Sequence, residues 1–254
     1  MKMRGKISQA LFPAAILLLF AALAQASDAH WSYEGESGPA YWGELAPEFK
    51  EAIGDAQSPI DLDINTPRQV SFHYEDGLFT AVNNGHTIQA APDDKNESCI
   101  VIDGTRYYLQ QLHFHTPSEH TVKGMAFPME AHFVNRSGEG RFAVVSVFID
   151  DGKENEVIKT IWDAVPKEKN VGARINNMFR LTALLPKKLD GFGYQGSFTT
   201  PPTTEGVLWI VLNEHIQASA EQIKWFTDLI GKNARPVQPS NGRALTPLQG
   251  GQKP

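Results

Sequence analysis

Cysteine is nearly absent from this sequence, since its 254 residues include only Cys99. One thiol cannot form a disulfide within the chain, and scarce cysteine is typical of proteins that stay in the reducing cytosol. Positive charge is also scarce: 23 Lys and Arg stand against 29 Asp and Glu, which gives a net charge of −6. Because nucleic-acid partners select basic faces, this balance argues against a nucleic-acid-binding role.

Long apolar segments are missing after residue 26, and no repeat or low-complexity tract divides the rest of the chain. A polytopic membrane protein, a collagen-like protein and a disordered chain are therefore not expected. Hydrophobic residues make up 41% of the sequence, and 21 Gly and 16 Pro are spread evenly, as short strands joined by tight turns require. This composition and length predict one β-rich globular domain.

The N-terminus contradicts the cytosolic interpretation. Cations within the first six residues precede an apolar stretch from Leu11 to Ala24, which ends in the small-x-small pattern Ala24-Gln25-Ala26. We predict a signal peptide over residues 1–26 and a periplasmic or secreted protein that has no membrane contact after cleavage. A membrane anchor is the alternative, but a spanning helix needs about 20 apolar residues and this core is shorter.

Four segments have the pattern of β-strands: Arg106–His115, Met129–Asn135, Arg141–Ile149 and Val207–Leu212. The last two are almost unbroken apolar runs, which is typical of central strands buried on both faces. Apolar spacing predicts a helix over 154–165, and Ser219 with Gln222 resembles a capping box that begins another helix. The segment from about Thr246, rich in Gly, Gln, Lys and Pro, is predicted to be frayed. We predict a mainly β (α+β) domain over 27–254, with a few short peripheral helices.

Three histidines have the spacing of a metal site. His113 and His115 alternate with Phe114 in a predicted strand, so their imidazoles point to one face about 6.5 Å apart. His132 lies in a second strand, which a hairpin could return beside the first. Three imidazoles leave a fourth coordination position open, which is typical of a catalytic zinc site. On this motif alone, an exposed pair of strand histidines is the alternative.

Gln111 and Glu130 favour the metal site over that alternative. Each lies two residues before a histidine of its own strand, so it shares a face with that histidine. Such groups accept a hydrogen bond from the outer ring N–H of a metal ligand and fix its tautomer. These residues together predict a Zn²⁺ centre.

Around this centre the sequence resembles α-class carbonic anhydrases of the bacterial, exported type. The resemblance runs in order from about residue 29 to 245, and it implies one catalytic domain around a large, twisted, mostly antiparallel sheet of about ten strands. The matching motifs are His30-Trp31-Ser32-Tyr33, Gln57-Ser58-Pro59-Ile60, Asn84-Gly85-His86, Gln111-Leu112-His113-Phe114-His115, Ser118-Glu119-His120-Thr121-Val122, Glu130-Ala131-His132, Gly196-Ser197-Phe198-Thr199-Thr200-Pro201-Pro202, Trp209-Ile210-Val211-Leu212 and Asn233-Ala234-Arg235-Pro236-Val237-Gln238-Pro239.

The resemblance implies reversible hydration of CO2 to bicarbonate and a proton through attack by zinc hydroxide, with one Zn²⁺ per chain. The zinc ligands would be the three histidines above, oriented in order by Gln111, by the backbone of Asn233 and by Glu130. Thr199 would accept a hydrogen bond from the hydroxide and donate one to a buried Glu119. This relay would aim the hydroxide at the CO2 carbon.

The resemblance also assigns a route for the proton. His86 would carry the proton, because the ordinary pKa of histidine suits exchange with a zinc-bound water. An exposed histidine in an Asn-Gly turn is the alternative. Tyr33, Asn84 and Gln89 match the polar residues that order the water chain.

A nonpolar substrate requires an apolar pocket. By resemblance its residues are Val134, Val144, Phe198 and Trp209, with Thr200 beside them, although plain core packing would explain the same residue types. Phe198 departs from the leucine usual in this family, and its larger ring would narrow the pocket mouth.

Many exported bacterial members carry a disulfide between positions near Ala52 and Thr203, but neither residue is cysteine here. We predict that Cys99 is an inert strand cysteine; an intersubunit bond is the alternative, in a chain that is a monomer or a homodimer. CO2, bicarbonate and water are the expected ligands, and anions and aromatic sulfonamides the expected inhibitors. Two other functions remain open: a noncatalytic binding module of the same family, and an exported zinc-binding protein.

Overall fold

The computed structural model describes residues 29–62, 68–93, 96–176, 178 and 180–251, so the predicted signal peptide lies outside it. The helices are α2 (Trp42–Leu45), α3 (Glu156–Ala164) and α4 (Ala220–Ile230), with 3-10 turns η1 (Gly35–Ser37), η2 (Pro47–Ile53) and η3 (Leu181–Leu184). The strands are β1 (Asp61–Leu62), β2 (Arg68–His73), β3 (Phe79–Asn83), β4 (Ile88–Pro92), β5 (Cys99–Ile102), β6 (Thr105–His115), β7 (Thr121–Val122), β8 (Met129–Ser137), β9 (Phe142–Asp151), β10 (Gly172–Arg174), β11 (Gly191–Ser197), β12 (Glu205–Leu212), β13 (Ile216–Ala218) and β14 (Thr246–Gly251). Within this part of the chain, no helix is long and apolar enough to span a membrane.

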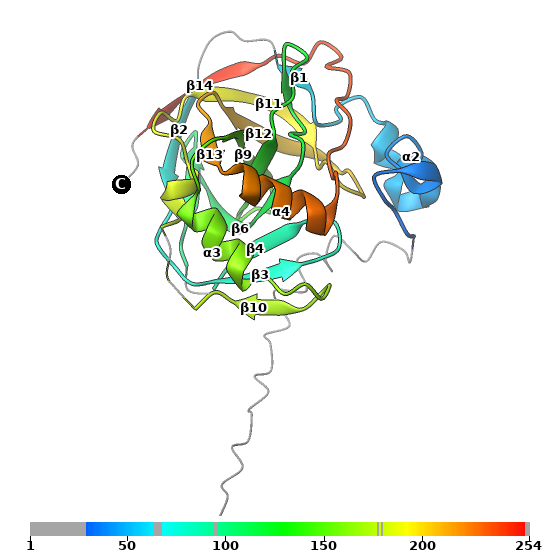
Figure 1. The fold of residues 1–254 in the computed structure, drawn as a ribbon. Helices are drawn as coiled ribbons and strands as arrows, with labels where there is room; N and C mark the ends of the chain where they lie inside the picture. The colour runs from blue at the N-terminus through cyan, green and yellow to red at the C-terminus, as the bar shows by residue number, and fades with distance from the viewer. Residues whose placement is uncertain (1–28, 63–67, 94–95, 177, 179, 252–254) are drawn as a thin grey trace, which may run out of the picture.

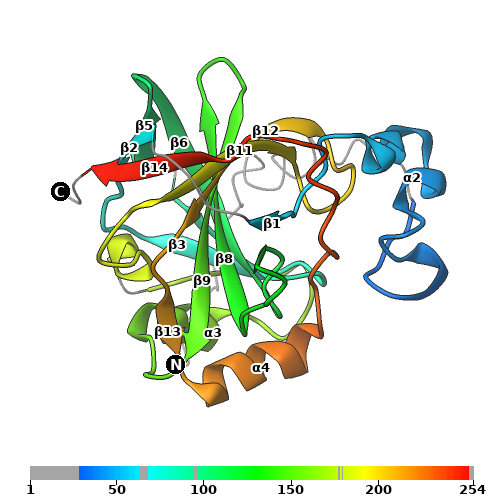
Figure 2. The ribbon, with the colours of Figure 1, turned by 90° about the horizontal axis from the view of Figure 1, so that it is seen from above.

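All strands except β1 and β7 belong to one sheet of 12 strands, where about ten were expected. Most neighbours in it are antiparallel, as predicted; the parallel pairs are β9 with β12, β9 with β13, and β2 with β14. The pairings form a closed circuit that runs β6, β8, β9, β12, β11, β14, β2, β5 and back to β6. Figure 2 shows β14 and β11 crossing the top of this circuit.

The sheet separates two apolar clusters. In β9, Val145 and Val147 pack into the larger cluster, while Val144 and Phe148 pack into the smaller one. Because neighbouring residues of a strand point to opposite faces, a strand between two cores is expected to be apolar at nearly every position, and in β9 the buried polar exception is Ser146. The predicted burial of this strand on both faces is therefore confirmed.

The two longer helices cover the larger cluster (Figure 1). Helix α3 begins after Asn155, whose side chain accepts from the amides of Val157 and Ile158, so it is shorter than the predicted 154–165. Helix α4 begins at the predicted capping box, in which Ser219 and Gln222 each satisfy the other's backbone amide. Both predicted helices are confirmed.

The prediction of a frayed tail from Thr246 is wrong for residues 246–251. These residues form β14, which pairs with β11 on one side and with β2 on the other. Leu248 is only 4% exposed and packs into the larger cluster. The Gly and Pro content of this segment disfavours a strand. The backbone hydrogen bonds that it makes to the edges of β11 and β2 stabilise the strand more than that content destabilises it. Residues 252–254 lie outside the described structure.

Candidate metal centre and active site

The three predicted metal ligands meet on adjacent strands. His113 in β6 lies directly opposite His132 in β8, and His115 follows on the same face of β6. The ring centroids are 5.0 Å apart for His113 and His115, 5.2 Å for His113 and His132, and 4.7 Å for His115 and His132. One nitrogen from each ring lies within 4.8 Å of the others, so the three can share one ion.

The outer nitrogen of each imidazole has a partner that can only accept. His113 Nδ1 lies 2.9 Å from Gln111 Oε1, and His115 Nδ1 lies 2.7 Å from the carbonyl oxygen of Asn233. His132 uses its other nitrogen, Nε2, which lies 2.8 Å from a carboxylate oxygen of Glu130. Each outer nitrogen therefore carries the hydrogen, and each inner nitrogen keeps its lone pair.

Two of those inner nitrogens, His115 Nε2 and His132 Nδ1, are buried and lack a hydrogen-bond partner. Burial is the main cause that lowers the pKa of all three imidazoles, to about 4 for His115, and the neighbouring rings add to it for His113. The rings are therefore neutral at pH 7, the form that binds metal. Unpartnered buried lone pairs on converging neutral imidazoles fit a zinc ion.

Glu130 is the most heavily hydrogen-bonded carboxylate of the site. Oε1 accepts from His132 and Ser146 and lies 2.6 Å from His120 Nδ1; Oε2 accepts from the amides of Glu119 and His120, at 2.7 and 2.9 Å. Although burial acts to raise the pKa of Glu130, these partners hold it well below its usual range. His120 and Glu130 could join His132 in a second metal cluster, but the atoms concerned already bind one another.

Glu119 lies beside the histidine triad and is also fully buried. Oε1 accepts a 2.8 Å hydrogen bond from the backbone amide of Arg235 and lies 3.5 Å from His115 Nδ1. Burial raises the pKa of Glu119 to about 7, and interactions with His132, the Arg235 amide and the Thr199 side chain oppose that rise. Oε2 has no partner that meets hydrogen-bond geometry. A cation held by the histidines would favour the ionised carboxylate.

Thr199 lies in the loop between β11 and β12 and is 4% exposed. The loop is held by a backbone hydrogen bond from Phe198 to Thr204 and by one from Thr203 to Thr200. As predicted from Pro201 and its neighbour, this segment is a loop and not a central strand.

The predicted apolar wall is one continuous cluster. Val134 and Val144 lie opposite each other on β8 and β9, and with Trp209 of β12 they belong to the smaller apolar cluster. Phe198 is half-buried against that cluster, and its ring meets Phe142 edge-on with centroids 5.0 Å apart. The Trp209 ring also packs 4.8 Å from the His132 ring, so the wall adjoins the metal site.

His86 lies in the turn between β3 and β4, where its ring stacks on Trp31 at 3.9 Å between centroids. Partial burial is the main cause that lowers its pKa, and the charge of Lys169 adds to it. Asn84 shapes this turn, because its Oδ1 accepts from the amides of His86 and Thr87.

The other two predicted water-path residues are Gln89 and Tyr33. Gln89 lies directly opposite His113 in the pairing of β4 with β6. Burial raises the pKa of Tyr33 well above its usual value, and the charge of Glu119 adds to this rise.

Several residues that shape the site carried no assigned role in the sequence. Arg235 is 2% exposed, and its guanidinium donates to Gln57 and to the carbonyl oxygens of Ser58 and Ala52. The Tyr194 hydroxyl lies 2.7 Å from His120 Nε2 and 2.9 Å from Ser58 Oγ. Arg235 and Tyr194 are far in sequence from the groups they hold; Arg235 stands in one of the matching motifs, whereas Tyr194 stands in none of them. Trp31 and Ser146 gave no local signal.

The fold and site define a β-sheet protein with three histidines that could hold a metal ion, set beside an apolar wall. A family model described as eukaryotic-type carbonic anhydrase matches residues 37–249. The chain belongs to this α-class carbonic anhydrase family, and it is an enzyme of that class.

Individual relatives agree with this assignment. A carbonic anhydrase of Klebsiella pneumoniae is 43% identical over 221 residues, which cover 85% of this chain and 90% of that protein. One from Pectobacterium carotovorum is 38% identical and covers 96% and 99% of the two chains. The solved complex of the Thermovibrio ammonificans α-carbonic anhydrase with the inhibitor sulfanilamide has a TM-score of 0.81 at 42% identity, covering 86% of this chain and 99% of that one.

Proposed function

We propose that this chain hydrates CO2 reversibly at a zinc ion held by His113, His115 and His132. The observation that carries the proposal is the convergence of three neutral imidazoles whose outer nitrogens are fixed and whose inner nitrogens lie within 4.8 Å of one another. Zinc would supply a Lewis acid that makes a bound water acidic, the chemistry for which carbonic anhydrases are the standard example.

Thr199 and Glu119 orient the attacking water. Glu119 is held by the Arg235 amide, and its interaction with the Thr199 side chain lowers its pKa. A threonine hydroxyl that donates to this carboxylate can only accept on its other side, so it selects one orientation of the water.

Val134, Val144, Phe198 and Trp209 provide the surface for CO2, and Thr200 borders it. Their side chains form one apolar cluster next to the His132 ring, where a nonpolar molecule is desolvated at little cost. The Phe198 ring lies against Phe142 and adds bulk at this wall. We propose that this bulk narrows the approach to the metal.

His86 transfers the proton to solvent. Its ring is half-buried on Trp31, and its lowered pKa keeps it neutral at pH 7, so it can accept a proton and pass it to buffer. Tyr33, Asn84 and Gln89 would order the water chain between the metal site and His86, and Asn84 also shapes the turn that carries His86.

The test is stopped-flow CO2 hydration by residues 27–254, with zinc quantified and with and without an aromatic sulfonamide. We expect hydration that scales with bound zinc and is inhibited by the sulfonamide, as the sulfanilamide complex of the Thermovibrio relative suggests. Zinc binding without hydration would favour the noncatalytic alternatives, and full activity in metal-depleted protein would refute the zinc mechanism.

We also propose that the chain is exported and that residues 1–26 are removed. The charged, apolar and small-x-small segments of the N-terminus support this location. N-terminal sequencing of the protein recovered outside the cytoplasm is expected to begin at Ser27. Sedimentation of that protein would decide between monomer and homodimer.

A further inference from the structure

Arg136 lies two residues beyond Val134 of the apolar wall. It shares the face of β8 that carries the predicted metal ligand His132. Alternate residues of a strand share a face, so His132, Val134 and Arg136 form one row. Burial decreases along that row, since His132 is 1% exposed, Val134 is 5% exposed and Arg136 is exposed. Four strand residues span about 13 Å, so Arg136 lies at the outer rim of the site.

An aromatic bridge connects this arginine to the loop that carries Thr199. The Arg136 guanidinium lies 5.4 Å from the centre of the Phe142 ring, its directly opposed partner on β9. Phe142 in turn meets Phe198, the residue before Thr199, at 5.0 Å between ring centroids. The guanidinium therefore lies over Phe142, which packs against the outer part of the apolar wall.

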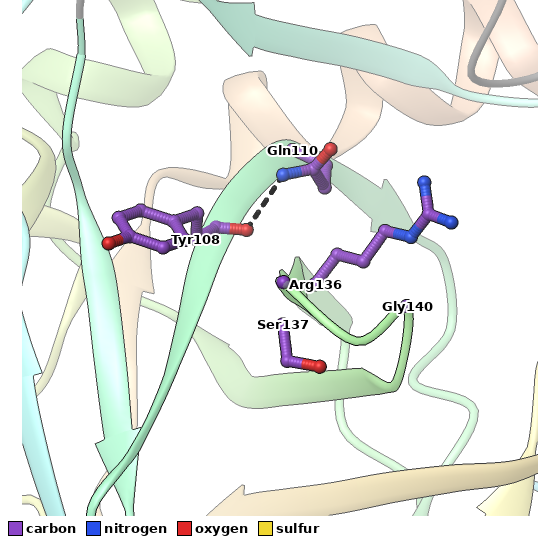
Figure 3. A pocket seen from close by; sticks show the side chains of 6 residues that line it. Tyr108, Gln110, Arg136, Ser137 and Gly140 are labelled. Atoms are coloured by element: carbon purple, nitrogen blue, oxygen red, sulfur yellow. Dashed lines mark hydrogen bonds between the residues drawn. The ribbon is translucent and has the colours of Figure 1, made fainter.

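Arg136 also lines a shallow pocket of about 350 Å³, and Figure 3 shows its side chain extending away from Tyr108. A register shift between Leu109 and Gln111 sets Gln110 out of the regular ladder, and its side chain donates to the carbonyl oxygen of Tyr108. The pocket lining is Tyr108, Gln110, Arg136, Ser137, Gly138 and Gly140.

Arg136 is the cation of that lining, and among the described residues no carboxylate lies within ion-pair distance of it. Arg141, in the same turn, differs because it lies 2.9 Å from Glu139 and packs over Tyr107. A guanidinium whose face lies over an aromatic ring can still donate hydrogen bonds from the N–H groups at its edge to a planar anion such as a carboxylate.

We propose that Arg136 forms an outer anion subsite that binds the carboxylate of a ligand whose other end occupies the metal site. This inference rests on the proposed function, because the metal site anchors the ligand. The subsite discriminates by charge, so it favours anionic over neutral substituents and weakens at high ionic strength.

The experiment compares three benzenesulfonamides: one without a tail, one with a flexible para tail ending in a carboxylate, and one whose tail ends in a carboxamide. Inhibition constants are measured for the parent enzyme, Arg136→Gln and the control Arg141→Gln, with several tail lengths, at low and high salt. We expect the parent and the control to prefer the carboxylate over the carboxamide by about two- to fivefold at low salt, the range of an exposed ion pair. Arg136→Gln is expected to lose that preference.

A preference that persists in Arg136→Gln, or that the parent lacks at every tail length, overturns the subsite. If the untailed sulfonamide fails to inhibit, the proposed zinc function fails instead. Benzoate titration followed by NMR at the Gly138 and Gly140 amides then tests the subsite alone. Saturable shifts in the parent that vanish in Arg136→Gln support it, and identical spectra in both overturn it.

Discussion

Replacing Glu130 by glutamine is the most informative perturbation of the metal centre. The two oxygens of Glu130 accept from two imidazoles, one hydroxyl and two backbone amides, and the side chain is fully buried. An amide has one acceptor oxygen, so its NH2 group must face donors. The orientation that loses fewer acceptors puts the NH2 in place of Oε2, and it leaves the backbone amides of Glu119 and His120 without an acceptor. At about 1–3 kcal/mol for each buried amide, this lowers the free energy of unfolding by about 2–6 kcal/mol. Loss of the negative charge of Glu130, which accepts from His132 Nε2, is expected to weaken zinc binding by about 10- to 100-fold.

Two measurements on Glu130→Gln test this reasoning at pH 7. Zinc affinity comes from competition with a chelator, and stability comes from urea unfolding of the zinc-free protein. Glu139→Gln is the matched control, because Glu139 is an exposed carboxylate in the turn between β8 and β9. Ser146→Ala removes one donor to Glu130 and is expected to have a smaller effect. Zinc affinity within twofold of the parent, together with unchanged unfolding, would refute the role given to Glu130.

Other predictions concern single groups. His115→Asn is expected to lose zinc and nearly all CO2 hydration, measured by metal analysis and stopped flow; retention of both would contradict the ligand assignment. His86→Ala is expected to turn over more slowly in weak buffer and to recover with added imidazole. Because partial burial lowers the pKa of His86, the turnover that depends on His86, measured in weak buffer as the difference between the parent and His86→Ala, should fall only at a pH below the ordinary titration range of histidine; a fall within or above that range would contradict this. Cys99 is 2% exposed and burial raises its pKa, so a thiol reagent at pH 8 should label it only after denaturation. Rapid labelling of native protein would contradict an inert cysteine.

Local pattern was sufficient for the elements that hold the metal. The alternation around His113 and the apolar run of β9 reflect which faces are buried, and burial acts on every residue of a strand. The capping box at Ser219 likewise depends on neighbours in sequence. Strand β14 could not be predicted in this way, because its stability comes from two distant sheet edges and from burial of Leu248.

The sequence predicted the parts of the site that lie close to the histidines along the chain, but not the contacts between residues far apart in sequence. The hydrogen-bond acceptors Gln111 and Glu130 follow from the face that each shares with its histidine. The contact of Arg235 with Glu119 joins residues 116 apart, and that of Tyr194 with His120 joins residues 74 apart. No local pattern encodes such pairs, because the fold alone brings these residues together. The stacking of His86 on Trp31 has the same origin.

The closed circuit of strands has a consequence for the order of events during synthesis. Strand β14 follows every other described strand in the chain, yet it occupies the position between β2 and β11. Until residues 246–251 have been made, the circuit has a seam with two unpaired edges. For a chain exported as proposed, this late strand delays completion of the sheet until nearly all of the domain has been synthesised. The metal site, on β6 and β8, then belongs to a sheet that closes into a circuit only with its final strand.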